Sequence, residues 1–403
     1  MKTEIYHDHI GSSVDIIRSG GLVAVPTETV YGLAANALDA DAVERIYEVK
    51  GRPTVKPLSL MVPDSAAIGE YCENVPAGAY ALAETFWPGP LTIVLKSKCL
   101  EPEIVRAGGD TVGLRCPDHQ LTLELLRQCG VPLAVPSANP SGLPAPKTAA
   151  EVLSWFDGRI DAVIDGGTCG YGEASTLLDM SRTPYRVLRA GALPEEELWR
   201  TLREHLTVVG ITGGSGCGKT TALNTLADLG ALVIDADAVY HELTVSSAAM
   251  RAELTARYGD VYDGETLDRK KLAAIVFSDP EALTDLNAIT HKYACAEIDR
   301  LLTEHARHGG TLAAIDAIAL LESKYGDSCA FTVAVTAPLA DRVARLTARD
   351  GISEEAALAR IRAQKSDAYF EQNCDFTLRN DGDRAAFEQT CKQFFTEVFN
   401  THG

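Results

Sequence analysis

Residues 213–220 read Gly213-Gly214-Ser215-Gly216-Cys217-Gly218-Lys219-Thr220, which is a complete phosphate-binding loop. An apolar run over residues 207–212 precedes the loop and a helical segment over 221–226 follows it, which is the context that the motif requires. In such a loop the backbone N–H groups face phosphates, the lysine neutralises them, and the threonine hydroxyl reaches Mg²⁺. The motif predicts a nucleotide-binding domain that begins in the middle of the chain, with a separate domain before it.

The boundary between the two domains is marked by Pro194 and the three glutamates that follow it, a pattern typical of a helix start. The 403 residues are enough for two or three domains, each with its own core. We therefore predict a first domain over residues 1–193, a helical connection over 194–206, and a second domain over 207–403.

The composition, 46% hydrophobic and 23% charged residues, is typical of a soluble globular protein. No apolar stretch approaches the roughly 18 residues of a membrane span, and the first residues lack an apolar signal core. Ten cysteines without a Cys-x-x-Cys pair indicate reduced thiols. These features predict a cytoplasmic protein that does not bind membranes.

The charge is acidic in both halves, with a net value of −19 for the whole chain. Residues 1–206 hold 18 Lys and Arg against 27 Asp and Glu, and the remainder hold 19 against 29. Neither half has the basic excess expected of a protein that grips nucleic acid through its phosphates. We expect no strong direct binding to nucleic acid.

Apolar strand candidates alternate with amphipathic helices in the second half, at residues 208–212, 231–235, 312–315, 331–335 and 376–378. This alternation predicts a parallel sheet covered on both faces, a three-layer α/β/α domain. The first half has candidates at 22–26, 91–95, 113–116, 133–136 and 162–165 in a less regular order. It predicts a mixed α/β sheet with some antiparallel pairing.

Two further features lie close to the loop. Asp235 and Asp237 end the second strand candidate, and a spacing of two places both on one face of a strand. At that strand end, one acid can contact Mg²⁺ or a substrate hydroxyl while the other accepts a proton. Cys217 stands beside Lys219 and a helix N-terminus, which favours a thiolate, although any small residue suits the loop.

Residues 207–403 resemble the dephospho-CoA kinase family, whose members phosphorylate the ribose 3′-hydroxyl of dephospho-CoA with ATP. The resemblance rests on the loop, on residues 233–237, and on Leu267-Asp268-Arg269, Val276-Phe277, Arg345-Leu346, Arg349-Asp350-Gly351-Ile352-Ser353, Arg360-Ile361, Gln364 and Asn380-x-Gly382. The chain departs from the family at Thr290-His291-Lys292, where Leu-His-Pro is usual, and at residues 317–322, where Pro-Leu-Leu-Phe-Glu is usual.

This resemblance implies a P-loop domain with a helical lid, Mg²⁺ as cofactor and a place in coenzyme A biosynthesis. Lys219, Asp237 as the base, and the lid residue Arg349 would be catalytic. The ATP-binding residues would be Gly214, Ser215, Gly216, Cys217, Gly218, Lys219, Thr220, Thr221 and Asn380, with Thr220 and Asp235 at the metal.

The first half contains two pairs of polar residues at fixed spacing. Lys50 and Arg52 supply two cations suited to polyphosphate, since the arginine fork takes two oxygens at once. Ser137 and Asn139 share a face if their segment is extended. Taken singly, a Lys-x-Arg pair is more often a solvated surface pair.

Together with their surroundings, these pairs resemble the YrdC-like family, whose enzymatic members are threonylcarbamoyl-AMP synthases. The matching motifs, in order from about residue 10 to 193, are Pro26-Thr27-Glu28-Thr29-Val30-Tyr31-Gly32-Leu33, Lys50-Gly51-Arg52-Pro53-x-x-Lys56-Pro57-Leu58, Trp87-Pro88-Gly89-Pro90-Leu91-Thr92, Val112-Gly113-Leu114-Arg115-x-Pro117, Ser137-Ala138-Asn139-x-Ser141-Gly142, Ser175-Thr176-x-x-Asp179 and Arg189-x-Gly191.

The second resemblance implies a twisted mixed α/β domain that makes threonylcarbamoyl-AMP and pyrophosphate from L-threonine, bicarbonate and ATP. Its product would pass to downstream proteins of a tRNA modification. Lys50 and Arg52 would stabilise the leaving pyrophosphate. Threonine would contact Thr29, Met61, Arg115, Ser137 and Ser175, and ATP would contact Arg52, Lys56, Thr111, Asn139, Lys147 and Arg189.

The sequence therefore favours a bifunctional transferase, a kinase joined to a nucleotidyltransferase. Two alternatives stay open. The first half could be a non-catalytic RNA-binding module, which the acidic balance disfavours. The second half could be another P-loop small-molecule kinase, such as a nucleoside monophosphate kinase.

Overall fold

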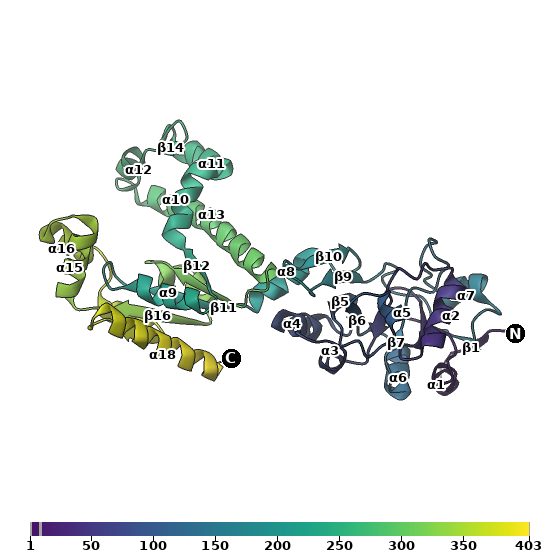
Figure 1. The fold of residues 1–403 in the computed structure, drawn as a ribbon. Helices are drawn as coiled ribbons and strands as arrows, with labels where there is room; N and C mark the ends of the chain where they lie inside the picture. Colours follow the sequence, from purple (N-terminus) through teal and green to yellow (C-terminus); the bar gives the residue numbers. More distant parts are fainter. Residues whose placement is uncertain (1, 8–9, 403) are drawn as a thin grey trace. The chain divides into compact units, whose positions relative to one another are not determined.

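The computed structural model describes residues 2–7 and 10–402, and the chain divides into two compact units (Figure 1). Unit 1 consists of Met1–His205 and Arg307–Gly309, and unit 2 consists of Leu206–Ala306 and Gly310–Gly403. The two units are described separately below.

Unit 1 is built on a ten-stranded mixed sheet, as the sequence predicted. Its strands, in spatial order, are β1 (Glu4–Tyr6), β8 (Ala162–Ile164), β2 (Val23–Val25), β3 (Gly32–Asn36), β7 (Leu133–Ala134), β4 (Ser59–Met61), β6 (Thr111–Arg115), β5 (Leu91–Lys96), β9 (Thr176–Asp179) and β10 (Arg186–Arg189). β4 pairs with β6 and β5 with β9 in parallel, whereas β5 and β6 are antiparallel.

Eight helices accompany this sheet in the described part of unit 1: α1 (Gly11–Arg18), α2 (Ala40–Lys50), α3 (Ala66–Tyr71), α4 (Ala77–Phe86), α5 (Glu103–Arg106), α6 (Gln120–Cys129), α7 (Ala149–Phe156) and α8 (Glu195–Glu204). Val14 and Ile17 of α1 and Leu126 of α6 bury their side chains in one core with strand residues such as Val23 and Leu133. α2 begins where the Asp39 carboxylate accepts hydrogen bonds from two backbone N–H groups, and its last residue is Lys50.

Unit 2 contains a five-stranded sheet in which every neighbouring pair is parallel. The order is β12 (Leu232–Asp235), β15 (Leu312–Asp316), β11 (Thr207–Thr212), β16 (Phe331–Thr336) and β17 (Phe376–Arg379). α9 (Lys219–Asp228) and α18 (Arg384–His402) pack against it through a core that includes Val209, Leu226 and Phe395. The predicted parallel α/β domain is confirmed.

The remaining elements of unit 2 form two smaller groups around the sheet (Figure 1). The first contains α10 (Ala236–Ser246), α11 (Ala248–Tyr258), α12 (Arg269–Val276), the long helix α13 (Pro280–Arg307) and a hairpin of β13 (Tyr262–Asp263) and β14 (Thr266–Leu267), packed around their own core. The second contains α15 (Leu339–Asp350), α16 (Glu354–Arg362) and α17 (Asp367–Asn373). Along the chain, two short elements come between these groups: the 3-10 helix η1 (Leu320–Glu322) and α14 (Lys324–Ser328).

The parallel arrangement brings the carboxyl ends of β11, β12 and β15 to one edge of the sheet. In the strand register Asp235 is opposite Asp316, and Asp316 is opposite Ile211. Because β11 leads directly into the phosphate-binding loop, both carboxylates lie next to that loop.

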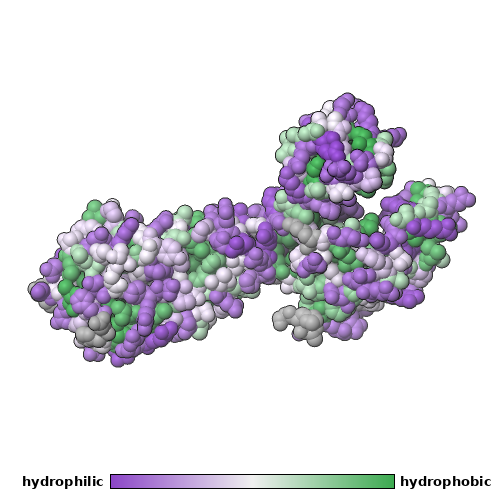
Figure 2. Space-filling model, turned by 180° about the vertical axis from the view of Figure 1, so that it is seen from behind, coloured by the Kyte–Doolittle hydropathy of each residue, from purple (hydrophilic) through white to green (hydrophobic). Residues whose placement is uncertain are grey.

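Within residues 2–7 and 10–402, no helix has both the length and the apolar character that crossing a bilayer requires. Figure 2 shows hydrophilic residues over most of the visible face, with hydrophobic residues scattered between them.

Candidate active sites

The phosphate-binding loop of unit 2 joins β11 to α9. Gly218 precedes the helix with a φ of +103°, and a Cβ at this position would collide with the Asn380 side-chain amide. The Lys219 ammonium group turns back over the loop, where Nζ donates to the Gly213 carbonyl at 3.3 Å. The same nitrogen lies 3.6 Å from Asp316 Oδ1, which holds it at the centre of the site.

A cavity of about 880 Å³ opens above this loop. All of the residues that the sequence assigned to the kinase site line it: Gly214, Ser215, Gly216, Cys217, Gly218, Lys219, Thr220, Thr221, Asp235, Asp237, Arg349 and Asn380. These residues come from four segments of the chain, so the tertiary structure brings together what the motifs indicated separately.

Sequence reasoning missed Asp316, which also lines the cavity. Burial is the main cause that raises the pKa of Asp316 to about 6, and nearby Asp235 and Asp237 act in the same direction against Lys219. Its Oδ1 is buried and makes no hydrogen bond to a described residue. The sequence does place Asp316 at the end of an apolar strand candidate. It does not show that this strand pairs with β11, which leads into the loop.

Three further arginines missed as site residues, Arg345, Arg360 and Arg384, line the same cavity. Arg345 donates to the Gly216 and Cys217 carbonyls and to Asn380 Oδ1. The Asn380 amide in turn donates to the Cys217 carbonyl at 2.9 Å. Asn380 therefore supports the loop itself. Arg349 is paired with the Asp350 carboxylate at 2.7 Å, and Arg360 binds the same carboxylate.

Asp235 and Asp237 do not share one face of a strand, so that expectation was wrong. β12 ends at Asp235, whose Oδ1 accepts a hydrogen bond from Ala238 N at 3.0 Å and caps α10. Asp237 belongs to the first turn of that helix. The strand gives way to a helix between the two acids, and each acid therefore has a different environment.

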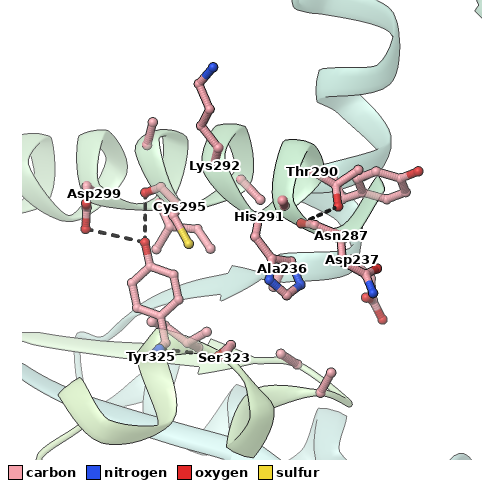
Figure 3. A pocket seen from close by; sticks show the side chains of 18 of the residues that line it. Ala236, Asp237, Asn287, Thr290, His291, Lys292, Cys295, Asp299, Ser323 and Tyr325 are labelled. Atoms are coloured by element: carbon pink, nitrogen blue, oxygen red, sulfur yellow. Dashed lines mark hydrogen bonds between the residues drawn. The ribbon is translucent and has the colours of Figure 1, made fainter. Parts of the chain in front are cut away.

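A second cavity, of about 780 Å³, lies between α10, α13 and the end of β15. Asp237 lines both this cavity and the one above the loop. In Figure 3 the His291 ring from α13 and the Asp237 carboxylate lie on the same side of the second cavity. At its other end, the Tyr325 hydroxyl donates to the Cys295 carbonyl at 2.8 Å (Figure 3).

Of the two interpretations of Cys217, a thiolate or a small residue that suits the loop, the structure favours the second. Only 1% of this residue is exposed, and its side chain belongs to the hydrophobic core beneath the loop. Burial raises the pKa of the Cys217 thiol, and this effect outweighs the opposing influence of Lys219. The loop has a small neutral side chain at this position.

In unit 1, Arg115 ends β6 inside the protein. Its Nη2 donates to Glu28 Oε1 at 2.8 Å and to Thr29 Oγ1 at 2.7 Å. Ser175 is hydrogen-bonded to Thr92 and Arg189. Its Oγ lies 2.8 Å from Thr92 Oγ1, and its carbonyl accepts a hydrogen bond from Arg189 Nη2 at 2.8 Å.

Arg189 lies near enough to two other arginines, Arg115 and Arg52, for their positive charges to act on it. Partial burial lowers the pKa of Arg189, and the positive charges of Arg115 and Arg52 lower it further. Arg52 is held by the carbonyls of Lys56 and Pro57. Glu28 pairs with Arg115 at 2.8 Å. An anion, such as a polyphosphate or a carboxylate, would relieve the repulsion among the three arginines.

The Lys50 ammonium group does not point into open space. The residue is 3% exposed, and Nζ donates to the carbonyls of Ser137 and Asn139. Burial lowers the pKa of Lys50 to about 7, with Arg52 as a second cause. The Ser137 hydroxyl donates to Asn139 Oδ1 at 2.5 Å, so Lys50 ties α2 to the loop that contains this pair.

Two other predicted residues of unit 1 lie close to these arginines: Met61 is opposite Arg115 in the β4–β6 register, and the Lys56 carbonyl accepts a hydrogen bond from Arg52. Thr111 begins β6 and Arg115 ends it, which separates them by about 13 Å at the usual rise of a strand. Met61 is 4% exposed and packs in the core. The side chain of Lys147 lies against Gly172, and the side chain of Lys56 is exposed.

The shifted pKa of Lys50 predicts a pH dependence of the stability of unit 1. The folded state binds this proton less tightly than the unfolded state, so the free energy of unfolding rises as pH increases from about 7 to 10.5. Below pH 7 both states are protonated and the contribution is constant. We expect the free energy of unfolding of the wild type to increase relative to that of Lys50→Met as the pH rises across this window.

All three tryptophans, at positions 87, 155 and 199, lie in unit 1, so their fluorescence during denaturation reports this unit in the full chain. Lys2→Met, at an exposed lysine, is the control. A difference that stays constant from pH 7 to 10 would show that Lys50 does not titrate in this range.

The loop at the end of the central strand, with a second cavity beside it, is typical of a nucleotide-binding domain with a parallel α/β sheet. Unit 1 is a mixed α/β domain. A family model for Sua5/YciO/YrdC proteins, described as telomere recombination, matches residues 15–191, and one for dephospho-CoA kinase matches residues 207–386. The chain belongs to the Sua5/YciO/YrdC family through its first half and joins it to a dephospho-CoA kinase domain.

Two relatives of the first half are named threonylcarbamoyl-AMP synthase. The protein from Pyrococcus abyssi is 45% identical over 188 residues, which cover 47% of this chain and 55% of the relative. The protein from Halorhodospira halophila is 36% identical over 163 residues, which cover 40% of this chain and 85% of the relative. The present chain therefore spans about half of the longer relative and most of the shorter one.

Among solved structures, a dephospho-CoA kinase from Campylobacter jejuni matches with 24% identity and a TM-score of 0.37. The match covers 49% of this chain and 99% of that chain.

Proposed function

We propose that the protein is a bifunctional enzyme with one active site in each unit. Residues 207–403 transfer the γ-phosphate of ATP to the ribose 3′-hydroxyl of dephospho-CoA. Residues 1–193 form threonylcarbamoyl-AMP from L-threonine, bicarbonate and ATP, and the helix over residues 194–206 connects the two domains. The family matches of both halves support this proposal.

The observation that carries the kinase proposal is the position of Asp237, which lines the nucleotide cavity and the second cavity alike. A base for phosphoryl transfer must reach the acceptor hydroxyl while the γ-phosphate is bound at the loop. Asp237 meets this requirement, whereas Asp235 is engaged as the cap of α10. ATP would occupy the loop cavity and the acceptor would occupy the second cavity.

The second cavity suits an acceptor with an extended, partly apolar arm, since alanines and isoleucines form much of its lining. Lys292, a departure from the family pattern, is among the residues that line this cavity, but its side-chain amine is engaged with Glu253, to which Nζ donates at 2.8 Å. In Figure 3 the end of the Lys292 side chain extends to the side of α13 opposite Tyr325. We propose that this substitution leaves acceptor binding intact. A screen of dephospho-CoA against nucleoside monophosphates tests the assignment, and a preference for a nucleoside monophosphate would contradict it.

Magnesium fits the donors at the loop. Asp316 has a buried carboxylate oxygen without a hydrogen bond, and it lines the same cavity as Thr220 and Asp235. No cluster of three or more protein metal ligands is found among the described residues. This is the usual situation for Mg²⁺, which keeps waters and binds nucleotide phosphates with one or two protein groups. Thr220 and Asp316 would hold the ion, which would offset the negative charge of the phosphates.

The observation that carries the synthase proposal is the convergence of Arg52, Arg115 and Arg189 beside Thr29 and Ser175. Threonine carbamate would attack the α-phosphorus of ATP, with pyrophosphate leaving, and no protein nucleophile is needed. The protein would position the anions and stabilise the charge on the leaving group. Thr29 and Arg115 would contact threonine, and Arg52 and Arg189 would contact ATP. The product would feed a tRNA modification.

We expect Arg52→Ala to lower threonine- and bicarbonate-dependent release of pyrophosphate by about 10²–10³-fold, the usual cost of removing one charge-stabilising donor. Arg186→Ala is the matched control, because Arg186 is exposed on nearby β10. The pyrophosphate assay is run with threonine, with serine and without an amino acid. Equal turnover with serine, or without any amino acid, would contradict the substrate assignment.

The alternative of an RNA-binding module is tested on the same protein by measuring RNA affinity against salt concentration. Tight binding with a steep salt dependence, in a chain that releases no pyrophosphate, would favour that alternative.

A further inference from the structure

The third residue of the phosphate-binding loop, Ser215, is held by side chains from the helices that follow β16. Gln364, between α16 and α17, contacts it twice: Oε1 accepts a hydrogen bond from Ser215 N at 2.8 Å, and Nε2 donates to Ser215 Oγ at 2.8 Å. Arg342, near the start of α15, donates from Nε to the Ser215 carbonyl at 3.0 Å. All three polar groups of Ser215 are thus satisfied from these helices.

Arg342 is itself fixed. Its side chain is only 5% exposed, and Nη1 binds Asp367 Oδ1 at 2.7 Å at the start of α17. The guanidinium group passes against Gly214, where a Cβ would collide with it. A buried arginine that is paired and hydrogen-bonded in this way cannot move without a large desolvation cost. We refer to Gln364, Arg342 and Asp367 as the Ser215 clamp.

The clamp residues contact the loop but not the nucleotide space. Ser215 lines the cavity above the loop, whereas Gln364 and Arg342 are absent from its lining. They therefore act through Ser215 and do not compete with phosphate for the loop. Arg345, Arg349 and Arg360, by contrast, line the cavity from α15 and α16.

The clamp and these arginines belong to one packed group of helices. Leu346 of α15 and Ala357 and Ile361 of α16 form a small shared core. Gln364 follows α16 by two residues, so a displacement of α15 and α16 would also displace the two hydrogen bonds to Ser215.

We propose that Gln364 is a positioning residue that sets the geometry of the phosphate-binding loop at Ser215 and couples it to the α15–α16 helices. This inference rests on the proposed kinase function. Phosphoryl transfer depends on the placement of the transferred group, so a loosened loop lowers turnover more than it lowers affinity for ATP.

The test compares Gln364→Ala, Ser215→Ala and the double variant in the dephospho-CoA kinase assay. We expect Gln364→Ala to lower kcat by about 10–100-fold while KM for ATP changes by less than about threefold. Ser215→Ala should have a smaller effect that disappears in the Gln364→Ala background, because the Oγ–Nε2 hydrogen bond is already lost there. Gln372→Ala, at an exposed glutamine of α17, is the control.

An unchanged kcat, a loss confined to KM, or fully additive effects of the two substitutions would overturn the proposal. Threonine-dependent pyrophosphate release by the same variants shows that unit 1 is folded, and a KM for ATP within about threefold of the wild type in the kinase assay shows that unit 2 is folded. If the wild type does not phosphorylate dephospho-CoA, the kinase proposal fails, and hydrogen exchange of residues 213–218 tests the clamp independently. Exchange there should be faster in Gln364→Ala than in Gln372→Ala, and equal rates would overturn the proposal.

Discussion

Lys219→Ala is expected to abolish phosphorylation of dephospho-CoA, with a loss greater than about 10³-fold, while threonine-dependent pyrophosphate release continues at the wild-type rate. Lys219 is the one cation of the loop itself, and its Nζ lies between the Gly213 carbonyl and Asp316. Without it, the developing charge on the transferred phosphate is uncompensated and Asp316 loses its partner. The two reactions are measured on the same purified preparation.

Lys270→Ala provides the matched control, because Lys270 is exposed on α12 and lines neither cavity of unit 2. The loop lies wholly within unit 2, so the synthase reaction should be unaffected. If Lys219→Ala silenced both reactions, the two sites would not be independent. If kinase activity persisted in Lys219→Ala, the proposed role of the loop in phosphoryl transfer would be contradicted.

Asp237→Asn is expected to lower kinase turnover by about 10²–10⁴-fold, the usual cost of losing a positioned base. Affinity for ATP should stay close to that of the wild type, because Lys219 and the loop amides bind the phosphates. The amide keeps the size of the carboxylate but accepts no proton. Turnover and nucleotide affinity are measured separately, by steady-state kinetics and by direct titration with ATP.

Asp235→Asn is the comparison, because asparagine also caps a helix N-terminus and preserves the bond to Ala238 N. This variant should keep more activity than Asp237→Asn and should show a weaker response to Mg²⁺ if Asp235 contacts the metal. Near-normal turnover of Asp237→Asn together with collapse of Asp235→Asn would reverse the two roles.

Local sequence patterns were sufficient for the central sheet of unit 2 and for half of the strands of unit 1. The phosphate-binding loop lies between strand and helix as expected, and the five strand candidates of the second half correspond to the five strands of the parallel sheet. A buried strand between helices has a strong apolar signal that depends only on neighbouring residues. In unit 1, β1, β3, β4, β9 and β10 were not anticipated, because strands of three to five residues carry little periodicity.

The sequence also indicated many of the residues that line the cavity above the loop of unit 2, since short motifs specify local backbone geometry. It did not indicate how those residues are held. Asp316 reaches Lys219 only because β15 pairs with β11, and these strands are about a hundred residues apart. Gln364 reaches Ser215 across a separation of 149 residues.

Burial was decided by the tertiary structure alone, and burial determines charge. The neighbours of Cys217 and Lys50 in the sequence are compatible with a thiolate and a charged ammonium group, yet packing raises the pKa of the thiol and lowers that of the ammonium group. The sequence by itself determines the chemical identity of each side chain. Its protonation state depends on desolvation and on neighbours that only the folded chain brings together.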